Sequence, residues 1–159
     1  MFRHVLAPLL APASVALVGA TEREGALGRI VWQNLAAGGL RGALSAVNPK
    51  HSAVFGQRCY PRLGKLPQPP DLAVLVTPAR TVPAILEEAG AAGVRAAVVL
   101  TSGFGETGAA GHTLQAEALA AARKHGLRLL GPNCLGLMRT DAGLNATFSP
   151  VPALALLES

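Results

Sequence analysis

A glycine-containing loop is the first feature of this sequence whose residue types and spacing suit a chemical role. It runs from Gly19 to Gly28 and leads straight into a segment with helical periodicity. Backbone N–H groups at a helix N-terminus, with the positive end of the helix dipole, favour a phosphate, and glycines let the backbone approach it closely. The candidate contacts within the loop are Gly19, Thr21, Arg23 and Gly25.

The spacing of these glycines leaves the ligand open. They follow the pattern G-x5-G-x2-G, whereas the fingerprint of dinucleotide-binding proteins is G-x-G-x-x-G. The longer spacing loosens the turn between strand and helix. From this loop alone, a phosphate-binding loop and a purely structural turn are both open interpretations.

A second loop, Val47–His51 (VNPKH), bears on the choice of ligand. A domain that binds NAD usually ends its second strand with an Asp or Glu that holds the adenosine ribose. Here the acid is absent and a cation, Lys50, follows the strand. Lys50 suits a phosphate on the ribose, as in NADP or coenzyme A (CoA). The alternative is a solvated surface lysine without a ligand.

Three further loops place short polar residues after apolar segments, at 77–78, 101–106 and 131–136. The hydroxyls and N–H groups of Thr101, Ser102 and Gly103 are suited to a phosphate or to an amide of the pantetheine arm. Cys134 is expected at the same edge of the fold, near any ligand. It is either a buried, inert thiol or a group with a chemical role.

No arrangement of residues in the sequence points to catalysis. The four histidines are His4, His51, His112 and His125, and none belongs to a group with metal-ligand spacing. A Ser-His-Asp order and a P-loop are also absent from the sequence. The pattern therefore favours a binding module without catalytic residues of its own.

The elements that must position these loops alternate between strand and helix. Apolar runs predict buried strands, and longer periodic segments predict helices. The strands are expected at 14–19, 44–47, 72–76, 96–100 and 128–130, and the helices at 29–37, 82–92 and 113–125. Residues 51–70 read as irregular, with a short extended piece around 58–60.

This alternation predicts an α/β fold, a Rossmann-like doubly wound parallel sheet of about five strands. In such a sheet, ligands bind outside the carboxyl ends of the strands, where the strand order reverses. All the candidate loops follow strands. We therefore expect them to meet at one edge of the sheet.

The composition narrows the class of partner. Half of the residues are hydrophobic and 14% are charged, which excludes a disordered chain. The net charge is +5, but the arginines are scattered, with no basic stripe and no interleaved aromatic residues. We therefore expect no nucleic-acid partner, because such sites combine basic grooves with stacking aromatics. A modest positive field suits a small polyanionic ligand.

The cysteines and the N-terminus indicate the cellular setting. Cys59 and Cys134 are too few for a disulfide framework, which favours a reducing, cytoplasmic environment. The apolar stretch 5–20 superficially resembles a signal peptide, but Pro8 and Pro12 interrupt it and it contains the best strand. We expect a lead-in segment there and no association with a membrane.

Five motifs in order along the chain carry a resemblance to a known family. They are Ser14–Thr21 (SVALVGAT), Val47–His51 (VNPKH), Thr101–Phe104 (TSGF), Leu130–Gly136 (LGPNCLG) and Gly143–Phe148 (GLNATF). Together they resemble the N-terminal CoA-binding domain of NDP-forming acyl-CoA synthetases. This is the ADP-forming acetate–CoA ligase family, related to the succinyl-CoA synthetase alpha subunit. The resemblance covers residues 10 to 150.

The resemblance implies a site for CoA. The segment 21–25 would wrap the CoA phosphates, and Lys50 would face the nucleotide end. The path toward the thiol would be lined by Thr77, Pro78, Thr101, Ser102, Gly103, Asn133 and Cys134. One departure is the presence of Glu22 and Glu24, because carboxylates beside a polyphosphate are unfavourable unless they point away.

The resemblance also implies partners outside this chain. Full enzymes of the family carry a domain with a phosphorylated histidine and an ATP-grasp unit, which would supply the ADP or ATP site on the same or a partner chain. They interconvert acyl-CoA, ADP and phosphate with acid, CoA and ATP. Some relatives are fused to an acetyltransferase and acylate protein lysines. No histidine here matches the phosphohistidine, so we expect the chain alone to bind CoA without catalysis.

Residues 1–150 are expected to form the CoA-binding domain, and 151–159 the truncated start of a following domain or a linker. Ala153–Leu157 has the pattern of an opening strand. Two alternatives remain: a stand-alone CoA-binding regulatory protein of the same fold, and an NADP-dependent oxidoreductase domain. The second would need a catalytic Tyr-Lys pair, and Tyr60 lies in the wrong segment for it.

Overall fold

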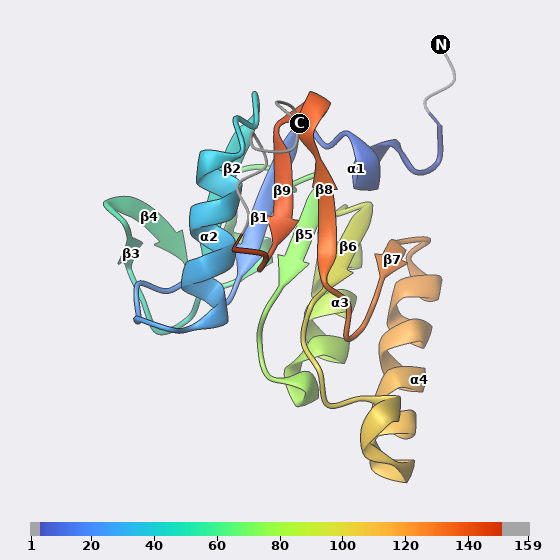
Figure 1. Ribbon diagram of the computed structural model, residues 1–159. Coiled ribbons are helices and arrows are strands. Elements are labelled where there is room, and N and C mark those ends of the chain that lie inside the picture. Colours follow the sequence, from blue (N-terminus) through green and yellow to red (C-terminus); the bar gives the residue numbers. More distant parts are fainter. Residues whose placement is uncertain (1–3, 151–159) are drawn as a thin grey trace.

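The computed structural model describes residues 4–150, and within them seven strands form one central sheet (Figure 1). The strands are β1 Ser14–Val18, β2 Ala43–Val47, β3 Ala53–Val54, β4 Gln57–Tyr60, β5 Leu72–Leu75, β6 Ala96–Val99 and β7 Arg128–Leu130. Their spatial order is β3-β4-β2-β1-β5-β6-β7. Every neighbouring pair is parallel except β3–β4.

The six parallel strands, counted along the chain, have the order 3-2-1-4-5-6. This is the strand order of the Rossmann fold, with its switch point between β1 and β5. The predicted fold class is therefore confirmed. The expected number of about five strands was too low, because β3 and β4 form a short hairpin at the sheet edge, within a segment that read as irregular.

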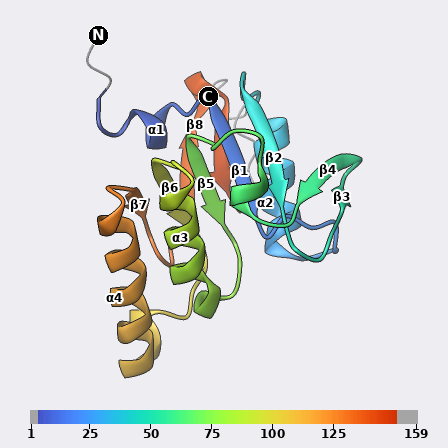
Figure 2. The ribbon, with the colours of Figure 1, turned by 180° about the vertical axis from the view of Figure 1, so that it is seen from behind.

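Helices cover both faces of the sheet. Helices α3 Val82–Ala91 and α4 Ala109–Lys124 pack on one face (Figure 2). Helix α2 Leu27–Ala37 packs on the other, and the short α1 Ala7–Leu10 precedes β1. Across residues 4–150, every helix, including the longest, α4, is too short or too polar to span a membrane.

Helix α4 begins four residues before its expected start at residue 113. Gly111 precedes the predicted start, and it lies in the first turn of α4 against the carbonyl oxygen of Phe104. A Cβ atom at this position would lie 1.8 Å from that oxygen. The glycine is thus needed for close packing of the helix N-terminus and does not interrupt the helix.

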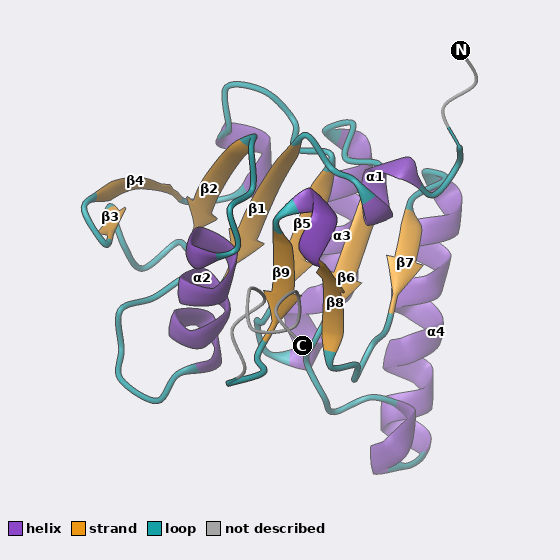
Figure 3. Ribbon diagram, turned by 45° about the horizontal axis from the view of Figure 1, so that its top comes forward, coloured by secondary structure: helices purple, strands orange, loops and turns teal. Residues whose placement is uncertain are grey.

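A two-stranded hairpin that the sequence patterns did not predict completes the layer beside α2. It consists of β8 Gly136–Arg139 and β9 Leu144–Thr147, joined by a short 3₁₀ turn and a left-handed Gly143. Figure 3 shows the hairpin next to α2, in front of the central strands. Its Leu144 and Ala146 belong to the same buried cluster as residues of β5 and β6.

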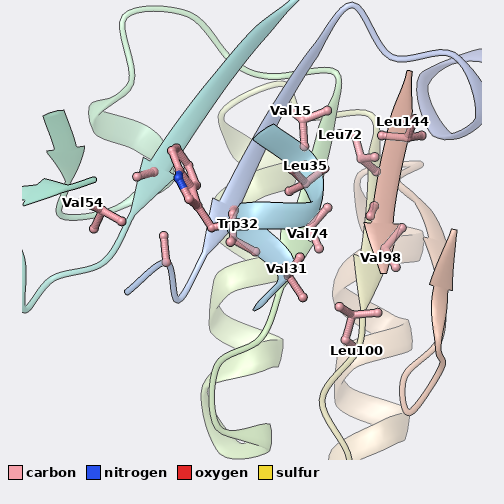
Figure 4. Close-up of a cluster of buried hydrophobic side chains, with 14 of the residues drawn as sticks. Val15, Val31, Trp32, Leu35, Val54, Leu72, Val74, Val98, Leu100 and Leu144 are labelled. Carbon is pink, nitrogen blue, oxygen red and sulfur yellow. The ribbon is translucent and has the colours of Figure 1, made fainter. Parts of the chain in front are cut away.

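The sheet is buried on both sides by alternating side chains of its strands. In β1, Val15 and Leu17 belong to the cluster under α2 and the hairpin, and Ala16 and Val18 to the cluster under α3 and α4. Figure 4 shows the first cluster, with Val31, Trp32 and Leu35 of α2 facing the strands. Each fully buried aliphatic side chain contributes about 1.5–3 kcal/mol. This double burial holds the strand ends, and the loops after them, in fixed positions.

The first residues of α2 approach the end of β1 unusually closely. A Cβ atom built on Gly28 would lie 2.0 Å from the carbonyl oxygen of Gly19. Gly19 itself has φ +99°, a conformation that side chains disfavour. The residues Gly19 and Gly28 therefore set how tightly the intervening loop is drawn against the sheet.

We expect the substitution Gly28→Ala to destabilise the protein by about 1–3 kcal/mol, because the added methyl group overpacks this contact. Helix propensity alone predicts the opposite sign, since alanine stabilises a helix interior by roughly 1 kcal/mol relative to glycine. Urea denaturation would measure the difference. Gly64→Ala is the control, because its Cβ would meet only the flexible carboxylate of Glu88, at 3.2 Å. Equal stability of the two variants would contradict the close contact.

Candidate functional site

A groove of about 540 Å³ lies at the carboxyl edge of the sheet, across the switch point. Seven of the twelve predicted site residues line it: Arg23, Thr77, Pro78, Thr101, Ser102, Asn133 and Cys134. They come from the loops after β1, β5, β6 and β7. A smaller hollow of about 320 Å³ lies at the opposite edge, beside Arg41 and Asp141. Because ligands of open parallel sheets bind at the carboxyl edge, the larger groove is the candidate site.

The loop after β1 is anchored at its start and open at its end. The Gly19 N–H donates to the carbonyl of Val47, at 2.8 Å, which continues the parallel ladder beyond β1. Thr21 Oγ1 accepts a hydrogen bond from the Arg23 N–H, at 3.3 Å. The N-cap residue Ala26 provides no side-chain cap to α2. The first N–H groups of a helix have no partner within it, so this end can receive an anionic group.

The loop after β2 is tied directly to the loop after β1. Asn48 Nδ2 donates to the carbonyl of Ala20, at 3.0 Å, and Asn48 Oδ1 accepts from the Lys50 N–H, at 2.9 Å. His51 Nε2 and Thr21 Oγ1 share a hydrogen bond at 3.2 Å. The backbone of Lys50 is therefore fixed beside the first loop, while the Lys50 side chain is exposed. None of Gly19, Thr21, Gly25 and Lys50 lines the groove itself; they lie in the two loops that follow β1 and β2.

Hydrogen bonds also join the loops after β5, β6 and β7. Thr101 Oγ1 donates to the carbonyl of Thr77, at 2.7 Å, and the Asn133 N–H donates to the carbonyl of Thr101, at 2.9 Å. Thr101 and Asn133 thus hold three adjacent strand exits together. The groove wall has a polar side formed by these loops, which can hydrogen-bond a chain that carries amides.

Gly103 differs from the other predicted residues of its loop. Its N–H donates to the carboxylate of Glu106 within the same turn, and this bond lowers the pKa of Glu106. Gly103 also does not line the groove. The structure therefore brings Thr101 and Ser102 to the groove and leaves Gly103 behind them, with φ +104° in the turn.

Cys134 lies on the groove wall. Burial raises the pKa of this thiol, against a smaller lowering by backbone hydrogen bonds. Its Sγ donates to the carbonyl of Val99, at 3.4 Å. Because only the thiolate is nucleophilic, these surroundings favour the inert interpretation of Cys134.

Apolar residues, none of them among the twelve predicted site residues, complete the groove. They are Leu27, Val76, Leu100, Leu135 and Phe148. Phe148 follows β9 and is fixed by Asn34 of α2, whose Nδ2 donates to the carbonyls of Thr147 and Ser149, at 2.8 and 3.0 Å. In the sequence, only the motif Gly143–Phe148 pointed to a role for Phe148. Nothing in the sequence pointed to Asn34, because its hydrogen-bond partners lie more than 110 residues away along the chain.

We expect Cys134 to react slowly with iodoacetamide at pH 7 in the native protein, and faster as the pH rises, because a raised pKa keeps the thiol protonated at neutral pH. Mass spectrometry of peptides after timed alkylation would follow Cys134 and Cys59 separately. Alkylation in guanidinium chloride provides the reference rate for the unfolded chain. A native rate at Cys134 equal to that reference would contradict the protected thiol.

Comparison with known proteins identifies the family. The family model described as a CoA binding domain matches residues 13–140. The ADP-forming acetate–CoA ligase I of Archaeoglobus fulgidus is 43% identical over 143 residues, which cover 90% of this chain and 21% of that protein. The alpha subunit of ADP-forming acetate–CoA ligase I from Pyrococcus furiosus is 39% identical over 94% of this chain and 33% of the subunit.

A solved structure agrees with these relatives. The dinucleotide forming acetyl-coenzyme A synthetase 1 of Ca. Korarchaeum cryptofilum, in complex with phosphate and ADP, superposes with a TM-score of 0.86 at 37% identity. The match covers 91% of this chain and 31% of that one. The chain thus spans between about a fifth and a third of the length of these relatives. It belongs to the family of CoA-binding domains, in the form found in ADP-forming acetate–CoA ligases.

Proposed function

We propose that this domain holds CoA along the carboxyl edge of its sheet, with the phosphates at the loop after β1 and the pantetheine arm in the groove. The proposal rests on three features that lie next to one another along the carboxyl edge of the sheet. An uncapped helix N-terminus, a tethered loop that carries Lys50 and a groove of about 540 Å³ adjoin one another. A long ligand with a polyanionic end and an amide-bearing arm matches these three features in their spatial order.

The residues fit the two ends of CoA. At the anionic end, Gly19, Thr21, Arg23 and Gly25 offer backbone N–H groups, a hydroxyl and a cation. Gly25 has φ +73°, and no atom lies within 4 Å of the position its Cβ would take, so the backbone is open to a phosphate there. At the other end, the proposed contacts of the arm are the groove residues Thr77, Pro78, Thr101, Ser102, Asn133 and Cys134, whereas Gly103 lies outside the groove and its N–H is bonded to Glu106.

We propose that Lys50 binds the 3′-phosphate at the nucleotide end of CoA. No acidic residue stands at the end of β2 to hold free ribose hydroxyls, and the exposed ammonium group of Lys50 follows the strand instead. A cation there suits the 3′-phosphate that distinguishes CoA from dephospho-CoA. The link from Asn48 to Ala20 keeps this loop beside the phosphate loop, so both phosphate groups would be held by one rigid frame.

In the whole protein, we propose that this domain, residues 1–150, supplies the CoA site of an ADP-forming acyl-CoA synthetase. Residues 151–159 would lead into a following domain or form a linker. The reaction interconverts acyl-CoA, ADP and phosphate with acid, CoA and ATP. Its phosphohistidine and ATP-grasp domains would lie elsewhere on the same chain or on a partner chain. Cytoplasmic placement is part of the proposal, since Cys59 and Cys134 are both free thiols.

We expect titration calorimetry of the 159-residue chain to show saturable binding of CoA and no binding of NADP. The physical reason is the arm: both ligands carry a ribose phosphate and a pyrophosphate, but only CoA carries the long amide-bearing arm that the polar side of the groove suits. Binding of NADP alone would favour the oxidoreductase alternative. Binding of neither ligand would contradict a self-sufficient CoA site in this chain.

We expect Lys50→Ala to weaken CoA binding by about 1–3 kcal/mol, as the loss of a charge-assisted hydrogen bond would, and to affect dephospho-CoA much less. Lys124→Ala is the matched control, because it removes the same charge at the far end of α4, where Lys124 pairs with Glu87. Calorimetry with the two ligands gives the comparison. Equal losses for CoA and dephospho-CoA would remove the assignment of Lys50 to the 3′-phosphate.

A further inference from the structure

Glu22 is at first sight misplaced in a loop that receives phosphates. Its negative charge, two residues before a second exposed carboxylate at Glu24, would repel a polyanion. The structure shows where the Glu22 carboxylate goes. Its Oε1 accepts a hydrogen bond from the backbone N–H of Phe55, in the turn between β3 and β4.

The Phe55 turn is built so that this N–H is available. Val54 and Gln57 pair across the hairpin, and the two residues between them, Phe55 and Gly56, both have positive φ, +48° and +74°. Two positive-φ residues are typical of a tight two-residue hairpin turn. The N–H of the first turn residue lies outside the β3–β4 ladder, and Glu22 satisfies it.

Arg29 of α2 makes a second and a third link at the same place. Its Nη1 donates to the backbone carbonyl of Glu22, at 2.6 Å. Its guanidinium group also lies over the Phe55 ring, 5.5 Å from the ring centre. Glu22 is therefore connected to the hairpin through its side chain and to α2 through its backbone. Both Glu22 and Arg29 contact Phe55: its backbone N–H donates to Glu22, and its ring, in a residue that is 39% exposed, faces the Arg29 guanidinium group.

We propose that Glu22 is a positioning residue for the phosphate loop: its carboxylate fastens the loop after β1 to the β3–β4 turn, and Arg29 braces the same contact. This inference rests on the proposed CoA site, and it explains the carboxylate that electrostatics alone would disfavour. A loop already fixed in the unliganded protein loses less conformational freedom when it closes on a ligand. The benefit to CoA binding would then exceed the repulsion from one exposed charge.

The proposal predicts a change in CoA affinity for Glu22→Ala that is opposite to the change expected from charge alone. If Glu22 only repelled the phosphates, Glu22→Ala would tighten CoA binding. As a positioning residue, Glu22 must have the opposite effect, and we expect Glu22→Ala to weaken CoA by about three- to tenfold. Glu22→Gln removes the charge but keeps an oxygen acceptor for the Phe55 N–H, and we expect it to retain the wild-type affinity or exceed it.

Glu24→Ala is the matched control, since it removes the same charge from the same exposed loop. We expect it to leave CoA affinity unchanged or to raise it. Calorimetric titration of the wild type and the three variants with CoA measures the effect. A tighter complex with both alanine variants would overturn the proposal, because charge alone would then account for the loop.

A second measurement separates this inference from the proposed function. Hydrogen exchange of the Phe55 amide, followed by NMR without CoA, reports the link directly. We expect faster exchange in Glu22→Ala and near wild-type exchange in Glu22→Gln and Glu24→Ala. Unchanged exchange in Glu22→Ala would overturn the link whether or not CoA binds. Loss of protection in Glu22→Ala together with a wild-type chain that binds no CoA would support the link and reject the proposed function.

Discussion

Strand β1 is hydrogen-bonded to β2 over all five of its residues and to β5 over four, and the chain builds outward from it in both directions. The loop after β1 runs into α2 on one face, whereas the loop after β5 runs toward α3 on the other. Loops that diverge in this way leave space between them at the carboxyl edge. The groove exists because the central strand has parallel neighbours whose connections separate.

The contact between Gly19 and Gly28 converts this topology into a defined site. It draws the start of α2 against the end of β1, so that the helix N-terminus faces the same edge as the groove. Hydrogen bonds of Asn48 and Thr101 then join neighbouring strand exits on each side of the switch point. Such a site binds through backbone groups and small polar side chains held by a rigid frame.

The sequence predicted the parts of the fold that depend on local patterns. Apolar runs such as 72–76 and 96–100 mark strands buried on both faces, and the loops after them follow from the topology. The β8–β9 hairpin was missed because its strands are short and β9 buries Asn145 and Thr147 beside its apolar residues, so no alternation is visible. These two buried polar side chains are hydrogen-bonded to each other, since Thr147 Oγ1 donates to Asn145 Oδ1 at 2.7 Å.

For the site, the sequence predicted the loops but not how they support one another. Seven predicted residues do line the groove, since their positions follow strands. The placement of Phe148 depends on Asn34, and the orientation of Glu22 depends on Phe55, 33 residues further along the chain. These are tertiary hydrogen bonds between segments with no local pattern in common. A single sequence contains no periodicity or spacing that reveals them.

The most direct test of CoA binding at the carboxyl edge is an NMR titration that follows the backbone amides as CoA is added. We expect the shifts to concentrate in residues 19–25, 50–51, 101–102 and 133–135. The amides beside the opposite hollow, at Arg41 and Asp141, should stay unchanged. Saturable shifts centred on that hollow or on the outer face of α4, with the carboxyl-edge loops unaffected, would contradict the site described for this domain.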